Sequence, residues 1–100
     1  MNDNVQYEFT CTAAPVQAEG TIAGKRFYFR SRHEEWTFSV SENQEIDPVD
    51  ITSADDAKGK GFFLEGRYGM SAFDASYMPL DIADKIIREC ADAYLQTKDV

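Results

Sequence analysis

The segment VQAEGTIAGKRFYFRSRHEEWTFSV, residues 16–40, decides the fold because it alternates apolar and polar residues in successive stretches. Ala23-Gly24 is a suitable two-residue turn, so residues 16–22 and 25–32 are predicted to form an antiparallel hairpin. In this register small or apolar residues face apolar ones, and polar residues face polar or amphipathic ones. The predicted pairs are Gly20 with Phe27, Ala18 with Phe29, Glu19 with Tyr28 and Gln17 with Arg30.

A second turn is predicted at His33-Glu34, or in a slightly longer loop around it, and it returns residues 35–40 along the hairpin. A slip of one residue would move the aromatic side chains from the core to solvent, so the pattern specifies the register. The predicted core face holds Phe27, Phe29, Trp36, Phe38 and Val40. The predicted pairs are Phe29 with Phe38, Phe27 with Val40, Arg32 with Glu35, Arg30 with Thr37 and Tyr28 with Ser39.

The rest of the chain adds strands and one helix to this unit. Period-2 alternation predicts further strands at residues 5–12 and 61–68. Residues 42–60 show neither helical nor strand periodicity, so they are predicted to be a long acidic connection. Residues 69–79 are expected to cross irregularly to the C-terminal helix.

The C-terminal helix is predicted at about residues 80–97, with Pro79 before it and Asp81 as its N-cap. Its apolar stripe should pack on the face of the sheet that carries the phenylalanines. The stripe consists of Ala83, Ile86, Ile87, Cys90, Tyr94 and Leu95. The expected fold is therefore α+β: one domain, residues 1–100, with an antiparallel sheet of four to five strands and one C-terminal helix on one face.

Composition limits the class of protein. A hydrophobic fraction of 43% supports a globular core and excludes a disordered chain. The N-terminal sequence MNDNVQYEF has neither a basic nor an apolar leader region, and no apolar run reaches the roughly 20 residues of a membrane span. We therefore expect a cytoplasmic protein, in which Cys11 and Cys90 are core thiols.

The net charge of −8 comes from one block of the sequence. No lysine or arginine occurs between His33 and Ala57, whereas the rest of the chain has ten acids and ten bases. This asymmetry disfavours nucleic acid as a direct partner and favours a basic protein surface. The predicted partner-binding residues are Glu34, Glu35, Glu42, Glu45, Asp47, Asp50, Asp55 and Asp56.

No motif predicts catalysis, a cofactor or a metal. His33 is the only histidine, and no nucleophile stands out beside it, so an exposed turn histidine is the simpler interpretation. Residues 47–56 offer carboxylates but lack the spacing of a calcium loop. Residues 58–63, KGKGFF, match neither a phosphate-binding loop nor a complete RNA-recognition motif.

A small basic cluster, Lys25, Arg26, Arg30 and Arg32, lies on the predicted hairpin. By alternation, Arg30 and Arg32 share the face opposite the core with Tyr28. A basic and aromatic face can bind a single nucleic-acid strand. The interleaved acids favour a salt-bridged outer face instead.

Residues 14–40, together with ASYMPLD at residues 75–81, resemble small proteins of bacteria and their phages. In size and acidity the chain is similar to anti-defence proteins, including anti-CRISPR proteins. The resemblance implies a non-enzymatic inhibitor that occupies a basic surface of a host nucleic-acid-handling complex. It assigns no role to any single residue.

We therefore expect a non-enzymatic, acidic binding protein with a basic protein partner and no membrane or direct nucleic-acid partner. Three alternatives stay open. The acidic block is a mobile loop that serves solubility; the chain is a small-molecule or divalent-metal-binding domain; or it is a homodimeric structural module whose sheet face or edge strand pairs with itself.

Overall fold

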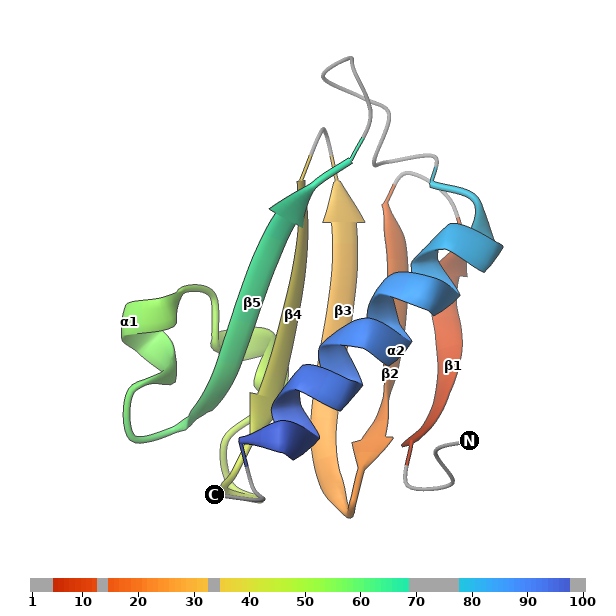
Figure 1. The fold of residues 1–100 in the computed structure, drawn as a ribbon. Helices are drawn as coiled ribbons and strands as arrows, with labels where there is room; N and C mark the ends of the chain where they lie inside the picture. Colours follow the sequence, from red (N-terminus) through yellow and green to blue (C-terminus); the bar gives the residue numbers. More distant parts are fainter. Residues whose placement is uncertain (1–4, 13–14, 33–34, 69–77, 98–100) are drawn as a thin grey trace.

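The structure is a computed structural model that describes residues 5–12, 15–32, 35–68 and 78–97. Five antiparallel strands form one sheet in the order of the chain, and one long helix crosses one face of it (Figure 1). The α+β prediction is therefore confirmed. The strands are β1 (Val5–Thr12), β2 (Val16–Ile22), β3 (Lys25–Arg32), β4 (Glu35–Ser41) and β5 (Gly61–Arg67), and the long helix is α2 (Leu80–Gln96).

The predicted register of the central hairpins is confirmed pair by pair. Between β2 and β3, Ala23 and Gly24 have φ values of 51° and 83°. Two positive φ angles in a two-residue loop suit the right-handed twist of the strands on either side. The other predicted turn, His33-Glu34, lies outside the described residues.

The outer strands also lie where alternation predicted them. β1 pairs with β2, and the register shifts between Phe9 and Cys11. β5 pairs with β4 so that Phe62 faces Val40 and Leu64 faces Phe38. Adding one strand on either side of the central three completes the five-stranded sheet.

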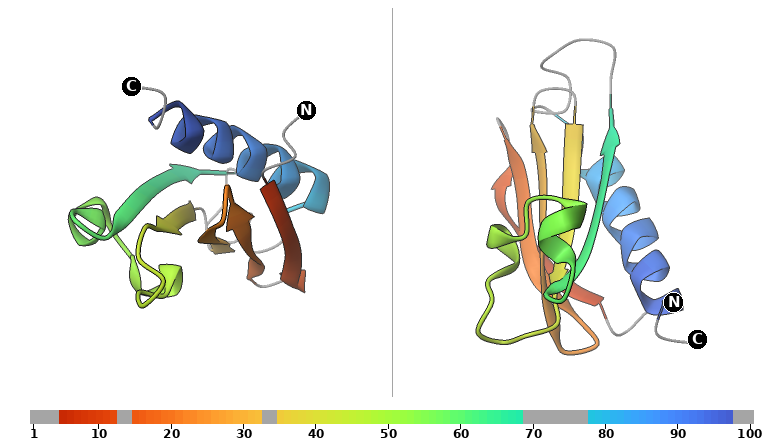
Figure 2. Two further views of the ribbon diagram at one scale, coloured as in Figure 1. Left: turned by 90° about the horizontal axis from the view of Figure 1, so that it is seen from below. Right: turned by 90° about the vertical axis from the view of Figure 1, so that its left-hand side faces the viewer.

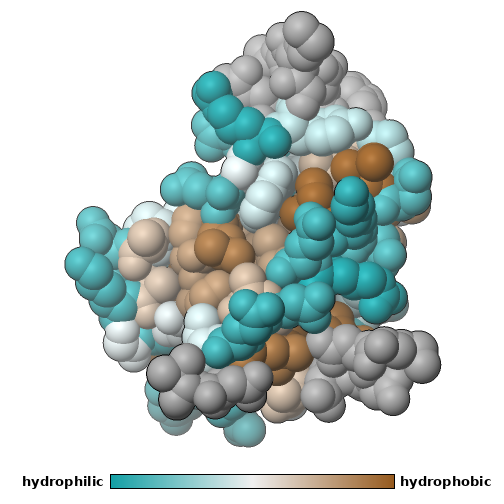
Figure 3. Space-filling view, viewed as in Figure 1, coloured by the Kyte–Doolittle hydropathy of each residue, from teal (hydrophilic) through white to brown (hydrophobic). Residues whose placement is uncertain are grey.

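The core lies between the sheet and α2. Phe27, Phe29 and Phe38 are fully buried there with Ile87 and Tyr94 of the helix, which confirms the predicted packing. Ala91 belongs to the same core, although the predicted stripe omitted it. The helix leaves part of this face open, and Figure 3 shows an apolar area between α1 and α2.

The start of α2 differs from the prediction. The N-cap position is occupied by Pro79, with φ −58° and ψ 142°, and it makes no side-chain capping bond. Asp81 lies inside the first turn, where its charge still suits the positive end of the helix dipole. Among the described helices, none combines the length and apolarity that crossing a membrane requires.

The connection between β4 and β5 contains two short helices that the sequence analysis did not predict. They are the 3₁₀ turn η1 (Pro48–Asp50) and the single-turn helix α1 (Ala54–Ala57). Neither is long enough to show a helical period, so their residues carry no periodic pattern that predicts a helix. Figure 2 shows the connection on the side of the sheet away from α2, with α1 beside β5.

Candidate functional site

The candidate site is built by residues 42–60, called the acidic connection below, and by the sheet surface opposite α2, called the outer face. The acidic connection begins each of its helices with a side-chain cap. The Asp47 carboxylate accepts a hydrogen bond of 3.0 Å from the Val49 amide, and Pro48 follows at a position that needs no amide proton. The Ser53 hydroxyl accepts one of 3.0 Å from the Asp56 amide. Both caps are residue types with this role, so the sequence did carry the signal.

Asp56 closes the same turn from its other end. Its carboxylate accepts hydrogen bonds from the hydroxyl and the amide of Thr52, at 2.8 and 3.3 Å. These bonds stabilise the charged form, so they lower the pKa of Asp56. The carboxylate is thus held in place while it stays charged.

Long-range bonds fasten the acidic connection to the sheet. The Ser39 hydroxyl on β4 donates to the Pro48 carbonyl at 2.7 Å. Arg26 on β3 donates to the carbonyls of Gln44 and Ile46 at 3.1 and 3.0 Å. Pro48, Ile51 and Ala57 are buried, so the segment also has apolar anchors. These contacts argue against the interpretation of residues 42–60 as a mobile, solvated loop.

The eight predicted partner-binding residues fall into separate groups. Six of them lie on the acidic connection. Glu42 and Asp56 are half-buried, and the other four are exposed: Glu45, Asp47, Asp50 and Asp55. Glu35 is exposed on the outer face of β4, and Glu34 lies outside the described residues. Asp55 makes a 3.4 Å ion pair with Lys58, but both side chains are so exposed that the pair contributes little.

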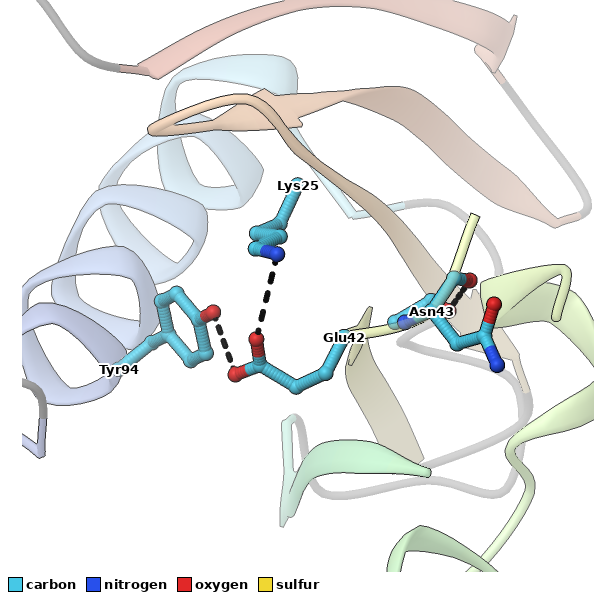
Figure 4. Close-up of polar contacts among 5 residues, drawn as sticks. Lys25, Glu42, Asn43 and Tyr94 are labelled. Carbon is cyan, nitrogen blue, oxygen red and sulfur yellow. Dashed lines mark hydrogen bonds and ion pairs between the residues drawn. The ribbon is translucent and has the colours of Figure 1, made fainter. Parts of the chain in front are cut away.

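Glu42 is used within the fold. The Tyr94 hydroxyl of α2 donates to one carboxylate oxygen of Glu42 at 2.6 Å, and Lys25 lies 3.9 Å from the other oxygen (Figure 4). Burial, followed by the contact with Glu42, raises the pKa of Tyr94. Glu42 therefore links the end of β4 to the helix. Apolar spacing had placed Tyr94 on the core stripe and gave no sign of this bond.

A groove of about 340 Å³ lies between the outer face and the acidic connection. Val49, Ile51 and Thr52 line it from the acidic connection, and the strands contribute Tyr28, Arg30, Arg32, Glu35 and Thr37. Alternation along the strands predicted that these strand residues share a face. It could not predict that the acidic connection would fold over them.

At its two central arginines, the described part of the outer face lacks the ion pairs that the interleaved charges suggested. Arg32 and Glu35 are cross-strand partners, but within the described ranges neither Arg30 nor Arg32 takes part in an ion pair. Burial raises the pKa of Tyr28, although the neighbouring Arg30 acts in the opposite direction. The groove is thus a partly dry surface with two arginines available to a ligand.

The sequence also raised the questions of a metal site, of His33 and of the two cysteines. Among the described residues, no three histidine, cysteine, aspartate or glutamate side chains gather where a metal ion could bind. His33 lies outside these residues. Cys11 is half-buried and Cys90 is buried, and the two are not joined by a disulfide.

No family model matches the chain, and no curated protein or solved structure matches it either. Function is therefore inferred from the geometry of the site.

Proposed function

We propose that this protein is a non-catalytic binding protein whose acidic connection binds a basic surface of another protein. The observation that carries the proposal is the order of the acidic connection: five carboxylates lie within twelve residues, on a segment that caps, buried anchors and sheet bonds hold in shape. A segment that only serves solubility needs none of these bonds.

An acidic connection that is ordered before it meets its partner favours binding. A disordered acidic segment would lose conformational entropy when it met its partner, and this loss would reduce its affinity. Here Asp47 and Asp56 are held by local hydrogen bonds, while Glu45, Asp50 and Asp55 extend into solvent. The carboxylates are presented before the partner arrives, so less of the interaction energy is lost to ordering.

The charge distribution favours a basic partner. All of the net charge of −8 comes from residues 34–56, and the rest of the chain is neutral. Such a patch speeds encounter with a positive surface, and this acceleration falls as salt screens the charges. We propose a nucleic-acid-handling protein of the cytoplasm as the partner class, because its binding channel is basic and the acidic connection would occupy it as an inhibitor.

Affinity capture with matched charge variants tests this function. The test variant Glu45→Gln/Asp50→Asn/Asp55→Asn removes three charges and leaves the capping carboxylates Asp47 and Asp56 in place. A control variant, Glu8→Gln/Asp81→Asn/Glu89→Gln, makes the same change in net charge at exposed positions on β1 and α2.

Each protein would be immobilised and exposed to a bacterial lysate at about 50 mM and about 500 mM salt, and the captured proteins would be quantified by mass spectrometry. We expect the wild type and the control variant to retain the same basic protein at low salt, and the test variant to lose it. Equal capture by all three, or capture that high salt does not reduce, would overturn the proposal.

A further inference from the structure

The groove on the outer face has a chemistry of its own, independent of the acidic connection as a docking segment. Arg30 occupies the centre of the sheet surface, between Gln17 of β2 and Thr37 of β4. Its Nε atom is buried and has no hydrogen-bond partner in the part of the chain that the structure describes. A buried donor without an acceptor is costly and uncommon. Because the Arg30 side chain lines the groove, a ligand toward which the guanidinium turns would supply that acceptor.

A second arginine, Arg32, adds further hydrogen-bond donors to the groove. Arg32 lies two residues farther along β3 on the same face, about 7 Å away along the strand. Each guanidinium presents a planar set of donors that matches an oxyanion. Both line the groove and, among the described residues, neither makes an ion pair.

The charge of the lining limits the ligand. Two arginines and Glu35 leave one uncompensated positive charge in the groove. Asp47, Asp50 and Asp56 lie on the neighbouring acidic connection and would repel a ligand of higher negative charge. A single carboxylate balances the site, whereas a phosphate dianion would not.

The opposite wall favours a ligand with an apolar part. Val49 is 43% exposed and lines the groove beside Ile51, which is only 3% exposed. An isolated carboxylate such as acetate would leave Val49 in contact with water. A carboxylate carried on a ring or a branched chain would cover it and gain from the burial.

We propose that the groove binds a small organic monocarboxylate, with Arg30 and Arg32 holding the carboxylate and Val49 covering its apolar group. Thr37 lines the same space and adds a hydroxyl that can donate to the ligand, whereas the Thr52 hydroxyl is already donated to Asp56. The volume of about 340 Å³ is within the range of small-molecule sites.

Nuclear magnetic resonance of the whole ¹⁵N-labelled chain tests the proposal, because the Nε–H signal of Arg30 reports on its own acceptor. The probe is benzoate, and the comparison compounds are neutral benzamide, acetate and inorganic phosphate. We expect benzoate to shift the Arg30 Nε–H signal and the Thr37 and Val49 amides in a saturable way. Benzamide should cause no such shift, and acetate and phosphate should bind more weakly than benzoate.

Variants distinguish recognition of the carboxylate by the groove arginines from a general effect of the protein's net charge. Arg30→Gln should abolish the benzoate response, and Arg30→Lys should weaken binding by about tenfold because it loses the planar donors. Lys85→Gln on α2 removes one positive charge far from the groove and should bind as the wild type does. Should Arg30→Gln fail to fold, Arg32→Gln at an exposed position serves in its place with a reduced affinity.

Three results would overturn the proposal. They are a wild-type spectrum unchanged by benzoate, an equal response to benzamide, and tighter binding of phosphate than of benzoate. Capture of a basic protein by the acidic connection could still succeed in each case, so this test and that of the proposed function fail independently.

Discussion

Gly20 lies in β2 where β1 passes so closely that no side chain fits. A Cβ atom at this position would overlap the carbonyl oxygen of Gln6 and would come within 2.5 Å of the Cβ atom of Tyr7. Gly24 differs, because a Cβ atom there would meet open space and only its φ of 83° favours glycine. One glycine thus permits strand pairing, and the other permits a turn.

This difference predicts that alanine lowers the free energy of unfolding more at Gly20 than at Gly24. Gly20→Ala should lower the free energy of unfolding by roughly 2–3 kcal/mol, because β1 must move away from β2. Gly24→Ala should cost only about 1 kcal/mol of backbone strain. Urea unfolding followed by circular dichroism measures both, and equal losses would contradict the close approach at Gly20.

The bond between Tyr94 and Glu42 joins the helix to the residue that follows β4, and its removal should weaken the fold. Tyr94→Phe should lower the free energy of unfolding by about 1–2 kcal/mol, because a hydrogen bond to a charged acceptor is lost. A double-mutant cycle with Glu42→Gln measures the coupling between the two side chains. Additive effects would show that the bond contributes nothing to stability. Glu42 would then count as a surface acid with no role in the fold.

At the scale of elements, the strands could be predicted and the acidic connection could not. The pairing of β2, β3 and β4 follows from local alternation and from the turn at Ala23-Gly24, which together permit a single register. The shape of the acidic connection depends instead on bonds from Ser39 and Arg26, residues that lie 9 to 20 positions away. Its caps at Asp47 and Ser53 were readable in the sequence, but the groove that it closes was not.

The anchor at Ser39 can be tested by itself. Ser39→Ala removes one of the two hydrogen bonds that the Pro48 carbonyl accepts, the other coming from the Ile51 amide, and this should cost about 1 kcal/mol. The loss should appear locally, as faster hydrogen exchange at the Asp50 and Ile51 amides that hold η1 together. Ser41→Ala, which removes only two local bonds between the Ser41 hydroxyl and the Asn43 backbone, is the matched control. Unchanged exchange in η1 after Ser39→Ala would mean that the apolar anchors are sufficient.

On the scale of the whole molecule, the fold separates its charges from its core. A neutral scaffold of sheet and helix carries the acidic connection on one side, and α2 covers the phenylalanines on the other. The exposed acids Glu45, Asp50 and Asp55 can therefore be changed without disturbing the core, which is what a binding surface requires. On the core side, Cys90 and Tyr94 of α2 are titratable groups buried between the helix and the sheet.

These two buried groups predict that the protein loses stability in alkali. Burial raises the pKa of Cys90 from its ordinary value of 9.0 to about 12, and the pKa of Tyr94 is raised above its ordinary 10.0. Below pH 9 both groups are protonated whether the chain is folded or not, so their contribution to stability is complete. Above it the unfolded chain releases protons that the folded chain retains, and unfolding becomes easier as pH rises.

The free energy of unfolding should therefore fall between about pH 9 and pH 12, by at most about 1.4 kcal/mol per pH unit for Cys90 alone. Urea unfolding at a series of pH values measures this slope in the wild type. Cys90→Ala should flatten the slope from about pH 9 upward, and Tyr94→Phe should flatten it only above about pH 10. If both variants keep the slope of the wild type, other groups cause the alkaline loss, and neither side chain holds its proton in the way that its burial between α2 and the sheet requires.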